Sequence, residues 1–365
     1  MLQHDGQQAF HSCAAAMKGH MKAVVKTQAG AGNTEIQERP EPSPKPGEVL
    51  VEVQVAGICG SDIHIAQGEF NDWLRPPVII GHEFSGVVAE LGAGVHDIGP
   101  GVRVTAETSY SVCGHCLYCQ SGNYNLCSQR QVLGYHVDGA FTRYVRVPRE
   151  RLYPLPAGVD FAAGALTEPL SCAVHAVSEQ TGISAGDLVV VFGPGTIGLL
   201  TAQVAKAEGG RVMVVGTAGD EKRLALASSL GVDWAVRADA DDVAAQVLEL
   251  SDGLGADVVI ECSGAETAAR MGLGVVRKRG KYTQMGIFGR TITMPFDILW
   301  QKEVQLQGSA SQKRSAWQRA LTLLRTGQVQ TAPLVTHTFP ITEWESALAK
   351  AVARDGVKIT LVPAD

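Results

Sequence analysis

The chain has 365 residues, a formal net charge of -6 at pH 7 and 45% hydrophobic residues. A single hydrophobic core stops growing at about 250 to 300 residues, so this length predicts two domains, and the composition is typical of a soluble globular protein. The acidic balance argues against a partner with a phosphate backbone, and no apolar run reaches the ~18 to 20 residues of a membrane span. We therefore expect neither nucleic acid nor a membrane as a partner.

Residues 1–20 have no early positive charge and no continuous apolar core, so they do not resemble a secretory signal. We expect a disordered extension there, because the first strand-like run begins at Met21. The chain has eight cysteines. Without an export signal, these are expected to be reduced thiols or metal ligands in a cytoplasmic protein.

Between Met21 and Val147, short β-type runs alternate with glycine and proline, for example at residues 49–55, 86–90 and 103–105. Helical periodicity is scarce in this part of the chain. The pattern predicts an irregular β domain.

Three side chains in this domain are of the types that bind Zn²⁺ directly: Cys59, His82 and Glu83. A catalytic zinc site uses about three protein ligands and leaves a fourth position open for water or substrate. Taken alone, the three residues are explained equally well by a buried thiol and a His-Glu pair at a turn.

Four further cysteines are clustered, namely Cys113, Cys116, Cys119 and Cys127, with two, two and seven residues between successive cysteines. Four sulfurs at such short spacings favour a closed tetrahedral Zn²⁺ site. An iron–sulfur cluster is the alternative, but its bacterial pattern places proline after a nearer fourth cysteine, whereas Ser128 follows Cys127.

From residue 188 onward, strand and helix patterns alternate. Strands are expected at residues 188–192, 212–215, 234–236, 257–261, 281–285 and 304–307, with helices over 197–207 and 221–230. This alternation predicts a doubly wound parallel sheet that is covered on both faces.

The first of these strands leads into the turn Gly193-Pro-Gly195-Thr-Ile-Gly198, which opens a helix. In that context the glycines permit a tight turn and the close approach of a pyrophosphate to the helix N-terminus. A glycine-rich turn without a ligand is the alternative.

Gly216 stands at the end of the second strand, where an acidic residue would bind the ribose of NAD. Asp220 or Glu221 could reach back to that place, or Lys222 and Arg223 could accept the extra phosphate of NADP. Helix-terminal charges that meet no ligand are a further alternative. We expect NAD, with NADP as the other possibility.

Glu168 lies in an apolar stretch near the expected junction of the two domains, where a carboxylate can bind a metal, position water or contact substrate. The alternative is an acid in the first turn of a helix, before Pro169. Cys172, His175 and Cys262 are assigned to packing.

After about residue 309, helices over 315–324 and from residue 343 and a strand over 357–362 are expected. We expect this tail to fold back onto the first domain.

With these groups in place, the chain resembles the zinc-containing medium-chain alcohol dehydrogenases, in particular the sorbitol and threonine dehydrogenase branch. The likeness runs from Met21 nearly to the C-terminus. It is carried by Gly-Ile-Cys59-Gly-Ser61-Asp-Ile-His64, Gly81-His82-Glu83, the four-cysteine cluster, Glu168-Pro-Leu-Ser, the turn from Gly193 to Gly198, Glu261-Cys-Ser-Gly264 and Pro333-Leu-Val-Thr-His337.

The resemblance implies a GroES-like catalytic domain over residues 21–170 and 310–365, split around a Rossmann domain over residues 171–309. It implies a zinc-dependent oxidoreductase that transfers hydride between NAD or NADP and a small-molecule secondary alcohol, which is a sugar alcohol, a sugar or an amino alcohol. It also implies about two zinc ions per chain and a homo-oligomer, either a dimer or a tetramer.

The resemblance further implies roles for individual residues. Cys59, His82 and Glu83 match the ligands of the catalytic zinc. Glu168 matches a carboxylate that approaches this zinc or its water. Ser61 and His64 match a proton relay to solvent. The four clustered cysteines match a structural zinc site. The positions that match cofactor contacts are Gly193, Gly195, Ile197, Gly198, Gly216, Arg223, Met285, Gly286 and Ile287.

The chain departs from the sorbitol branch at a substrate position, where the stretch Gly308-Ser309-Ala-Ser311-Gln312 stands in place of an Arg-Tyr pair that contacts the polyol. Two other functions are considered. A zinc-independent quinone or enoyl reductase of the same superfamily is disfavoured by the intact set of Cys59, His82 and Glu83. A zinc-stabilised binding protein is disfavoured by the acidic composition.

Overall fold

The computed structural model describes residues 19–364. Residues 1–18 of the expected N-terminal extension lie outside this range, and His20, also expected in the extension, is the first residue of strand β1 (His20–Lys26). No helix in the described range has the length and apolar character needed to cross a membrane.

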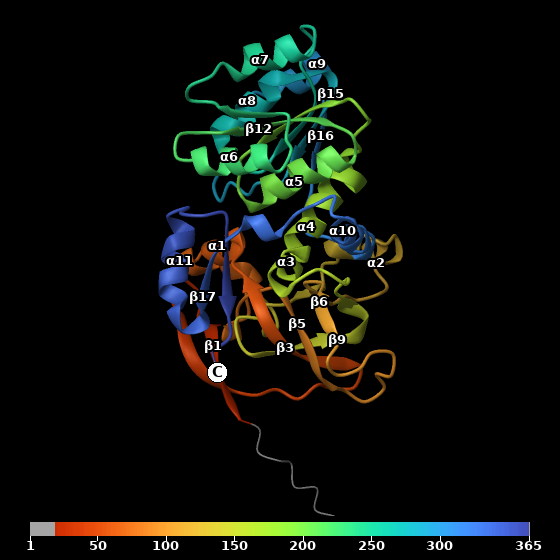
Figure 1. Ribbon diagram of the computed structural model, residues 1–365, viewed down its shortest axis with the longest axis vertical. Helices are drawn as coiled ribbons and strands as arrows, with labels where there is room; N and C mark the ends of the chain where they lie inside the picture. Colours follow the sequence, from red (N-terminus) through yellow and green to blue (C-terminus); the bar gives the residue numbers. More distant parts are fainter. Residues whose placement is uncertain (1–18, 365) are drawn as a thin grey trace, which may run out of the picture.

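A six-stranded parallel sheet forms the upper half of the molecule in Figure 1. Its spatial order is β13-β12-β11-β14-β15-β16, which in chain order is the 3-2-1-4-5-6 arrangement of doubly wound dinucleotide-binding domains. The strands are β11 (Leu188–Phe192), β12 (Arg211–Gly216), β13 (Trp234–Arg237), β14 (Ala256–Glu261), β15 (Val276–Gln284) and β16 (Gln305–Gly308). The predicted parallel sheet is confirmed.

Strand β11 is at the centre of this sheet because all five of its residues are apolar and buried. Val189 and Val191 point into one hydrophobic cluster, while Leu188, Val190 and Phe192 point into the other. Helices cover both faces: α5 (Thr196–Ala207), α6 (Glu221–Ser229), α7 (Val243–Leu250), α8 (Glu266–Val275) and α9 (Asp297–Lys302).

The lower half of Figure 1 is built on a mostly antiparallel sheet in the order β10-β6-β5-β3-β18-β17, with β9 also pairing with β3. The strands are β3 (Glu48–Gly57), β5 (Glu83–Leu91), β6 (Arg103–Ala106), β9 (Tyr144–Pro148), β10 (Leu152–Pro154), β17 (Val335–Pro340) and β18 (Lys358–Val362). The C-terminal strand β18 lies between β3 and β17, so this part of the tail folds back onto the first half of the chain as predicted.

Two smaller sheets complete this half: β1 pairs with β2 (Thr34–Pro40) and β4 (Val78–Ile79), and β7 (Ser109–Ser111) pairs with β8 (Gln131–Val132). Short helical segments connect the strands. They are α1 (Gly60–Gln67), η1 (Asn71–Trp73), α2 (Leu117–Gln120), η2 (Tyr124–Leu126), η3 (Arg149–Arg151), α3 (Phe161–Ala165), η5 (Ala332–Leu334), η6 (Ile341–Glu343) and α11 (Trp344–Val352).

Helices α4 (Thr167–Val174) and α10 (Arg314–Thr326) lie side by side between the two halves in Figure 1, and α4 continues into η4 (His175–Thr181). Leu170 of α4 and Ala320 of α10 belong to the same hydrophobic cluster as Val191 of the parallel sheet. The chain therefore passes between the halves through a packed region, which brings Glu168 and the residues just before α10 to the junction.

Candidate active site at the junction of the two halves

Three potential metal ligands converge below the junction. Cys59 is the residue that precedes helix α1, while His82 and Glu83 come at the start of β5. Their ligand atoms all lie within 4.8 Å of one another. Both His82 and Glu83 are buried, with 5% and 1% of their surface exposed. Gly81, which directly precedes His82, must be a glycine, because it has a φ of +92° and a Cβ at this position would lie 2.3 Å from the ring of Phe141.

The surroundings of this cluster fit a divalent cation. Burial by itself lowers the pKa of His82, but the carboxylate of Asp62 and the thiol of Cys59 outweigh it and raise this pKa to about 10. His82 Nδ1 has no hydrogen-bond partner although it is buried, and such groups are rare without a ligand or a specific role. Sulfur, nitrogen and carboxylate donors in a negative environment suit Zn²⁺.

Two buried charged residues position the cluster, and sequence reasoning did not identify either of them. Asp62 Oδ2 accepts a hydrogen bond from the backbone N–H of Cys59 at 2.8 Å, and Asp62 Oδ1 lies 3.7 Å from His82 Nδ1. Lys358 forms an ion pair with Glu83 and donates to the carbonyl of Ile58 at 2.9 Å. Asp62 belongs to the quoted Cys59 motif, whereas nothing in the local sequence indicates that Lys358 meets Glu83.

Glu168 is in the first turn of α4 and is 6% exposed. Burial raises the pKa of its carboxyl group to about 7. Its Oε1 accepts a hydrogen bond from Gln312 Nε2 at 3.1 Å. Cys172, which was assigned to packing, also contacts this carboxylate, with Sγ 3.7 Å from Oε1.

Ser61 and His64 lie three positions apart on α1, which places them on the same side of the helix. Ser61 Oγ is buried and has no hydrogen-bond partner. The side chain of His64 is 25% exposed, and its Nδ1 lies 2.5 Å from Glu69 Oε2. The two side chains thus extend from the buried site toward solvent.

The four-cysteine lobe, residues 113–127, brings together Cys113, Cys116, Cys119 and Cys127 with all four sulfurs within 4.8 Å of one another. Cys113 Sγ lies 3.8 Å from Cys119 Sγ and 3.6 Å from Cys127 Sγ. A tetrahedron with Zn–S bonds of about 2.3 Å has sulfur separations of about 3.8 Å. Hydrogen bonds from the backbone of His115 and Cys116 lower the pKa of Cys113 to about 6, which favours a thiolate.

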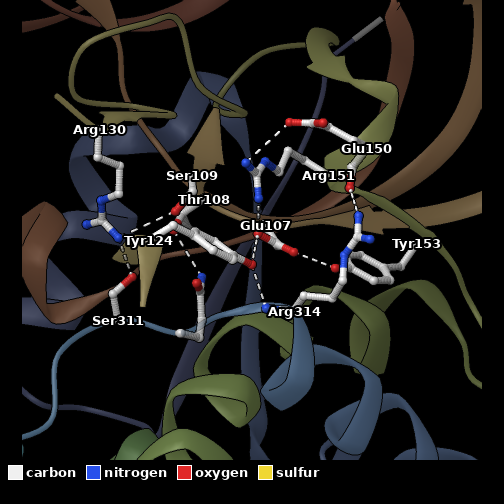
Figure 2. A network of polar contacts seen from close by, with 11 residues as sticks. Glu107, Thr108, Ser109, Tyr124, Arg130, Glu150, Arg151, Tyr153, Ser311 and Arg314 are labelled. Atoms are coloured by element: carbon white, nitrogen blue, oxygen red, sulfur yellow. Dashed lines mark hydrogen bonds and ion pairs between the residues drawn. The ribbon is translucent and has the colours of Figure 1, made fainter. Parts of the chain in front are cut away.

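A buried polar network joins this lobe to the junction (Figure 2). Glu107 is fully buried and accepts hydrogen bonds from Arg151 Nη1 at 3.1 Å, from the Tyr124 hydroxyl at 2.9 Å and from the Tyr153 hydroxyl. The Tyr124 oxygen in turn accepts the backbone N–H of Arg314, at the start of α10, at 2.5 Å.

The glycine turn at the carboxyl end of β11 has the properties of a cofactor cradle. Gly193 has a φ of +95°, and a Cβ on Gly198 would lie 1.9 Å from the carbonyl oxygen of Gly193. Gly195, directly before α5, has no atom within 4 Å of the place that a Cβ would take. The N-terminus of α5 therefore opens onto free space, as a bound pyrophosphate requires.

The remaining predicted cofactor residues lie around the same end of the sheet, with Gly216 ending β12 and Ile197 in the first turn of α5. Met285, Gly286 and Ile287 follow β15, and Ile287 is 54% exposed. Arg223 is engaged within the protein, since its guanidinium donates to the carbonyl of Gly356 at 2.6 Å.

A doubly wound sheet with this glycine turn, beside a β domain that gathers zinc-type donors, defines a nicotinamide-dependent zinc dehydrogenase. Comparison with known families agrees: residues 45–157 match the alcohol dehydrogenase GroES-like domain, and residues 196–326 match the zinc-binding dehydrogenase domain. The chain belongs to the zinc-containing medium-chain alcohol dehydrogenase family, which confirms the predicted resemblance.

Individual relatives match over nearly the whole chain. A sorbitol dehydrogenase of Halalkalibacterium halodurans is 48% identical over 94% of this chain and 100% of its own length. A D-arabitol-phosphate dehydrogenase of Enterococcus avium is 37% identical over 94% of this chain and 98% of its own. Among solved structures, a putative zinc-binding dehydrogenase from Sinorhizobium meliloti bound to NADP has a TM-score of 0.87 and 33% identity, covering 95% of this chain and 100% of that one.

The chain is therefore a zinc-dependent oxidoreductase of alcohols that uses a nicotinamide cofactor. This class of enzyme accounts for both the fold and the matches to known proteins. A zinc-independent reductase and a non-catalytic binding protein, the two other functions considered from the sequence, are therefore not required.

Proposed function

We propose that this protein interconverts a secondary hydroxyl of a sugar alcohol or a related polyol and the corresponding ketone. The observation that carries the proposal is the convergence of Cys59, His82 and Glu83 next to Glu168, below the open turn at Gly195. The names of the two relatives, a sorbitol and an arabitol-phosphate dehydrogenase, support a polyol as substrate.

Cys59, His82 and Glu83 would hold the catalytic zinc, and the four-cysteine lobe a structural zinc, giving about two ions per chain. When bound, the catalytic zinc supplies Lewis-acid chemistry that acidifies a substrate hydroxyl. Lys358 and Asp62 keep Glu83 and Cys59 in place, because each forms a buried polar contact with one of these ligand residues.

Ser61 takes up the proton from the substrate hydroxyl. Its Oγ is buried and free of partners, and a hydroxyl can both accept and donate a proton. His64 then passes the proton to solvent, since its side chain is partly exposed and an imidazole ring can both accept and donate a proton. Glu168, held by Gln312, orients the hydroxyl or a water molecule beside the metal ligands.

The glycine turn would bind the pyrophosphate, with Ile197, Met285, Gly286 and Ile287 around the remainder of the cofactor. We assign NAD as the preferred cofactor. A Cβ on Gly216 would lie 3.1 Å from Asp220 Cβ, so the Asp220 carboxylate is close to the usual acidic position. A negative charge there disfavours the 2′-phosphate of NADP, and the Arg223 guanidinium is already engaged by Gly356.

We also propose a homo-oligomer that forms through the edge strand β16. Leu306 of this strand is 42% exposed and Trp300 of the preceding helix α9 is 83% exposed. An exposed apolar sheet edge is a template for pairing with another chain. Light scattering of the purified protein tests this, with a monomer as the contrary result.

We assign residues 21–170 and 310–365 to the catalytic domain and residues 171–309 to the Rossmann domain. We place the protein in the cytoplasm, because none of the seven cysteines of the described range forms a disulfide, as expected in a reducing compartment.

The decisive experiment combines metal analysis with reduction of NAD⁺ and NADP⁺ on a panel of polyols, sugars and amino alcohols. We expect about two zinc ions per chain and turnover of a polyol with NAD⁺. Cys59→Ser should lose one zinc and all turnover while remaining folded. Full zinc content and activity in this variant would show that Cys59 is not a ligand.

A further inference from the structure

Among the described residues, the guanidinium of Arg130 forms no ion pair with a carboxylate. It lies just after the four-cysteine lobe and just before β8, and it is partly buried. Its Nη1 donates to Ser311 Oγ at 2.7 Å and lies 3.5 Å from Ser109 Oγ (Figure 2). Within residues 19–364, no carboxylate is within ion-pair distance of this guanidinium.

This charge is next to the active site. Ser311, which Arg130 contacts, is adjacent to Gln312, and Gln312 donates to Glu168 Oε1 at 3.1 Å and to Thr108 Oγ1 at 3.0 Å. The guanidinium is also within electrostatic reach of Glu168. Arg130 and Gln312 therefore border the carboxylate that is proposed to face the substrate.

Gln312 has an unused hydrogen-bonding atom. The residue is fully buried, both printed contacts use its amide nitrogen, and its Oε1 has no partner. A buried carbonyl oxygen of this kind is normally satisfied in the functional state. A substrate hydroxyl is a donor of the right kind.

A guanidinium that forms no ion pair with the protein can bind an anion of a ligand. Burial lowers the pKa of Arg130, which reflects the cost of holding the charge away from water. A planar guanidinium presents several N–H donors in a geometry that matches the oxygens of a phosphate or a carboxylate. The hydroxyls of Ser109 and Ser311 occupy Nη1 only, so the other donor groups of Arg130 remain available.

We propose that Arg130 binds an anionic group carried by the substrate alcohol, a phosphate ester or a carboxylate, while Gln312 Oε1 accepts a hydrogen bond from a substrate hydroxyl. This inference rests on the proposed dehydrogenase function and narrows its substrate class from neutral polyols to anionic ones. Arg130 is a specificity-determining residue in this account.

The test uses the zinc-loaded full-length protein and matched substrates that differ in charge: glucitol, glucitol 6-phosphate and gluconate. Values of kcat and KM are measured for the wild type, Arg130→Met and Arg130→Lys. Arg75→Met is the control, because Arg75 is an exposed arginine in the same half whose guanidinium donates to the backbone carbonyl of Leu74 at 3.3 Å and contacts neither Ser311 nor Gln312 in the described residues.

We expect the wild type to favour one of the anionic substrates over glucitol in kcat/KM. In Arg130→Met this ratio should fall about 10- to 100-fold, mainly through KM, as for the loss of a charged hydrogen bond. Arg130→Lys should restore part of it, and Arg75→Met should leave it unchanged. Whether the phosphate or the carboxylate gains more identifies the anionic group.

A preference for glucitol in the wild type, or an equal loss on all three substrates in Arg130→Met, would overturn the proposal and make Arg130 a structural brace between the lobe and Ser311. If no alcohol is oxidised at all, the proposed function fails separately. Calorimetric binding of glucitol 6-phosphate to the wild type and to Arg130→Met then tests the subsite directly, and equal or absent binding refutes it.

Discussion

The buried carboxylate of Glu107 offers a stringent test of what holds the catalytic half together. Replacing it with alanine removes the acceptor for three donors, from Arg151, Tyr124 and Tyr153. The Arg151 side chain is only 8% exposed, so its charge cannot turn to water without a rearrangement.

Breaking a buried ion pair by removing one partner costs about 3 to 5 kcal/mol. Arg151 retains a second carboxylate, that of Glu150 at 3.2 Å, but Glu150 is 66% exposed and such pairs contribute only about 0 to 1 kcal/mol. Each kcal/mol lowers Tm by about 2 to 4 °C in a domain of this size, so we expect Glu107→Ala to lower Tm by about 6 to 20 °C.

Thermal unfolding of Glu107→Ala and of the matched control Glu150→Ala, which removes the exposed partner of the same arginine, provides the measurement. The control should lose no more than about 4 °C. Because Tyr124 belongs to the four-cysteine lobe, Glu107→Ala should also release zinc to a chelator faster than the control. Equal shifts in the two variants would refute the reasoning, since they would mean that burial of Glu107 adds nothing.

Three further predictions concern separate parts of the molecule. Burial would raise the pKa of Glu179, but hydrogen bonds from His175 and Ser315 and the charge of Lys313 outweigh burial and lower this pKa. The ionised carboxylate of Glu179 therefore stabilises the fold fully above pH 4.5, the ordinary pKa value, and this stabilisation is lost as the pH falls through the lowered pKa. The Tm difference between wild type and Glu179→Gln should shrink accordingly in an acid titration, and a constant difference would contradict this. Cys116→Ser should lose one zinc and have a lower Tm, whereas Cys59→Ser should lose activity with little change in Tm. Metal analysis and calorimetry of the two variants distinguish these outcomes. Gly195→Ala should raise the Kd for NAD⁺ about 10-fold or more, because the added methyl enters the free space proposed for the pyrophosphate, and unchanged affinity by fluorescence titration would locate the cofactor elsewhere.

Much of the parallel sheet was predictable because its central strands are continuous apolar runs. β11 has the predicted bounds, β12 is longer than predicted by one residue at each end, and β14 is longer by one residue at its start. Strand β15 begins at Val276, earlier than predicted. The prediction missed this start because the first residues, Val-Arg-Lys-Arg-Gly, have no sequence pattern typical of a strand. Of these residues only Val276 is paired, opposite Ala256; the register then shifts, and pairing resumes at Lys281 opposite Val258.

The candidate ligands were recognisable because each set is contained in a short stretch of chain. Lys358 and Arg130 were not recognised as parts of the site, and the contact of Gln312 with Glu168 was not predicted, since each becomes significant only through a tertiary contact. Lys358 meets the carbonyl of Ile58 across 300 residues, and Gln312 meets Glu168 across 144. No periodicity or local motif contains that information.

The place of β18 in the antiparallel sheet has a consequence for how the protein is made. Strand β3 ends at Gly57, but its neighbour β18 is synthesised only after the whole parallel sheet, about 300 residues later. At ~5 to 20 residues per second, Ala56 and Gly57, the end of β3 that pairs with β18, remain without this partner for roughly 15 to 60 s of translation. During that interval the first half of the nascent chain presents an open strand edge to its surroundings. The dependence of yield on chaperones should therefore exceed that of a protein whose domains are completed in the order in which they are translated.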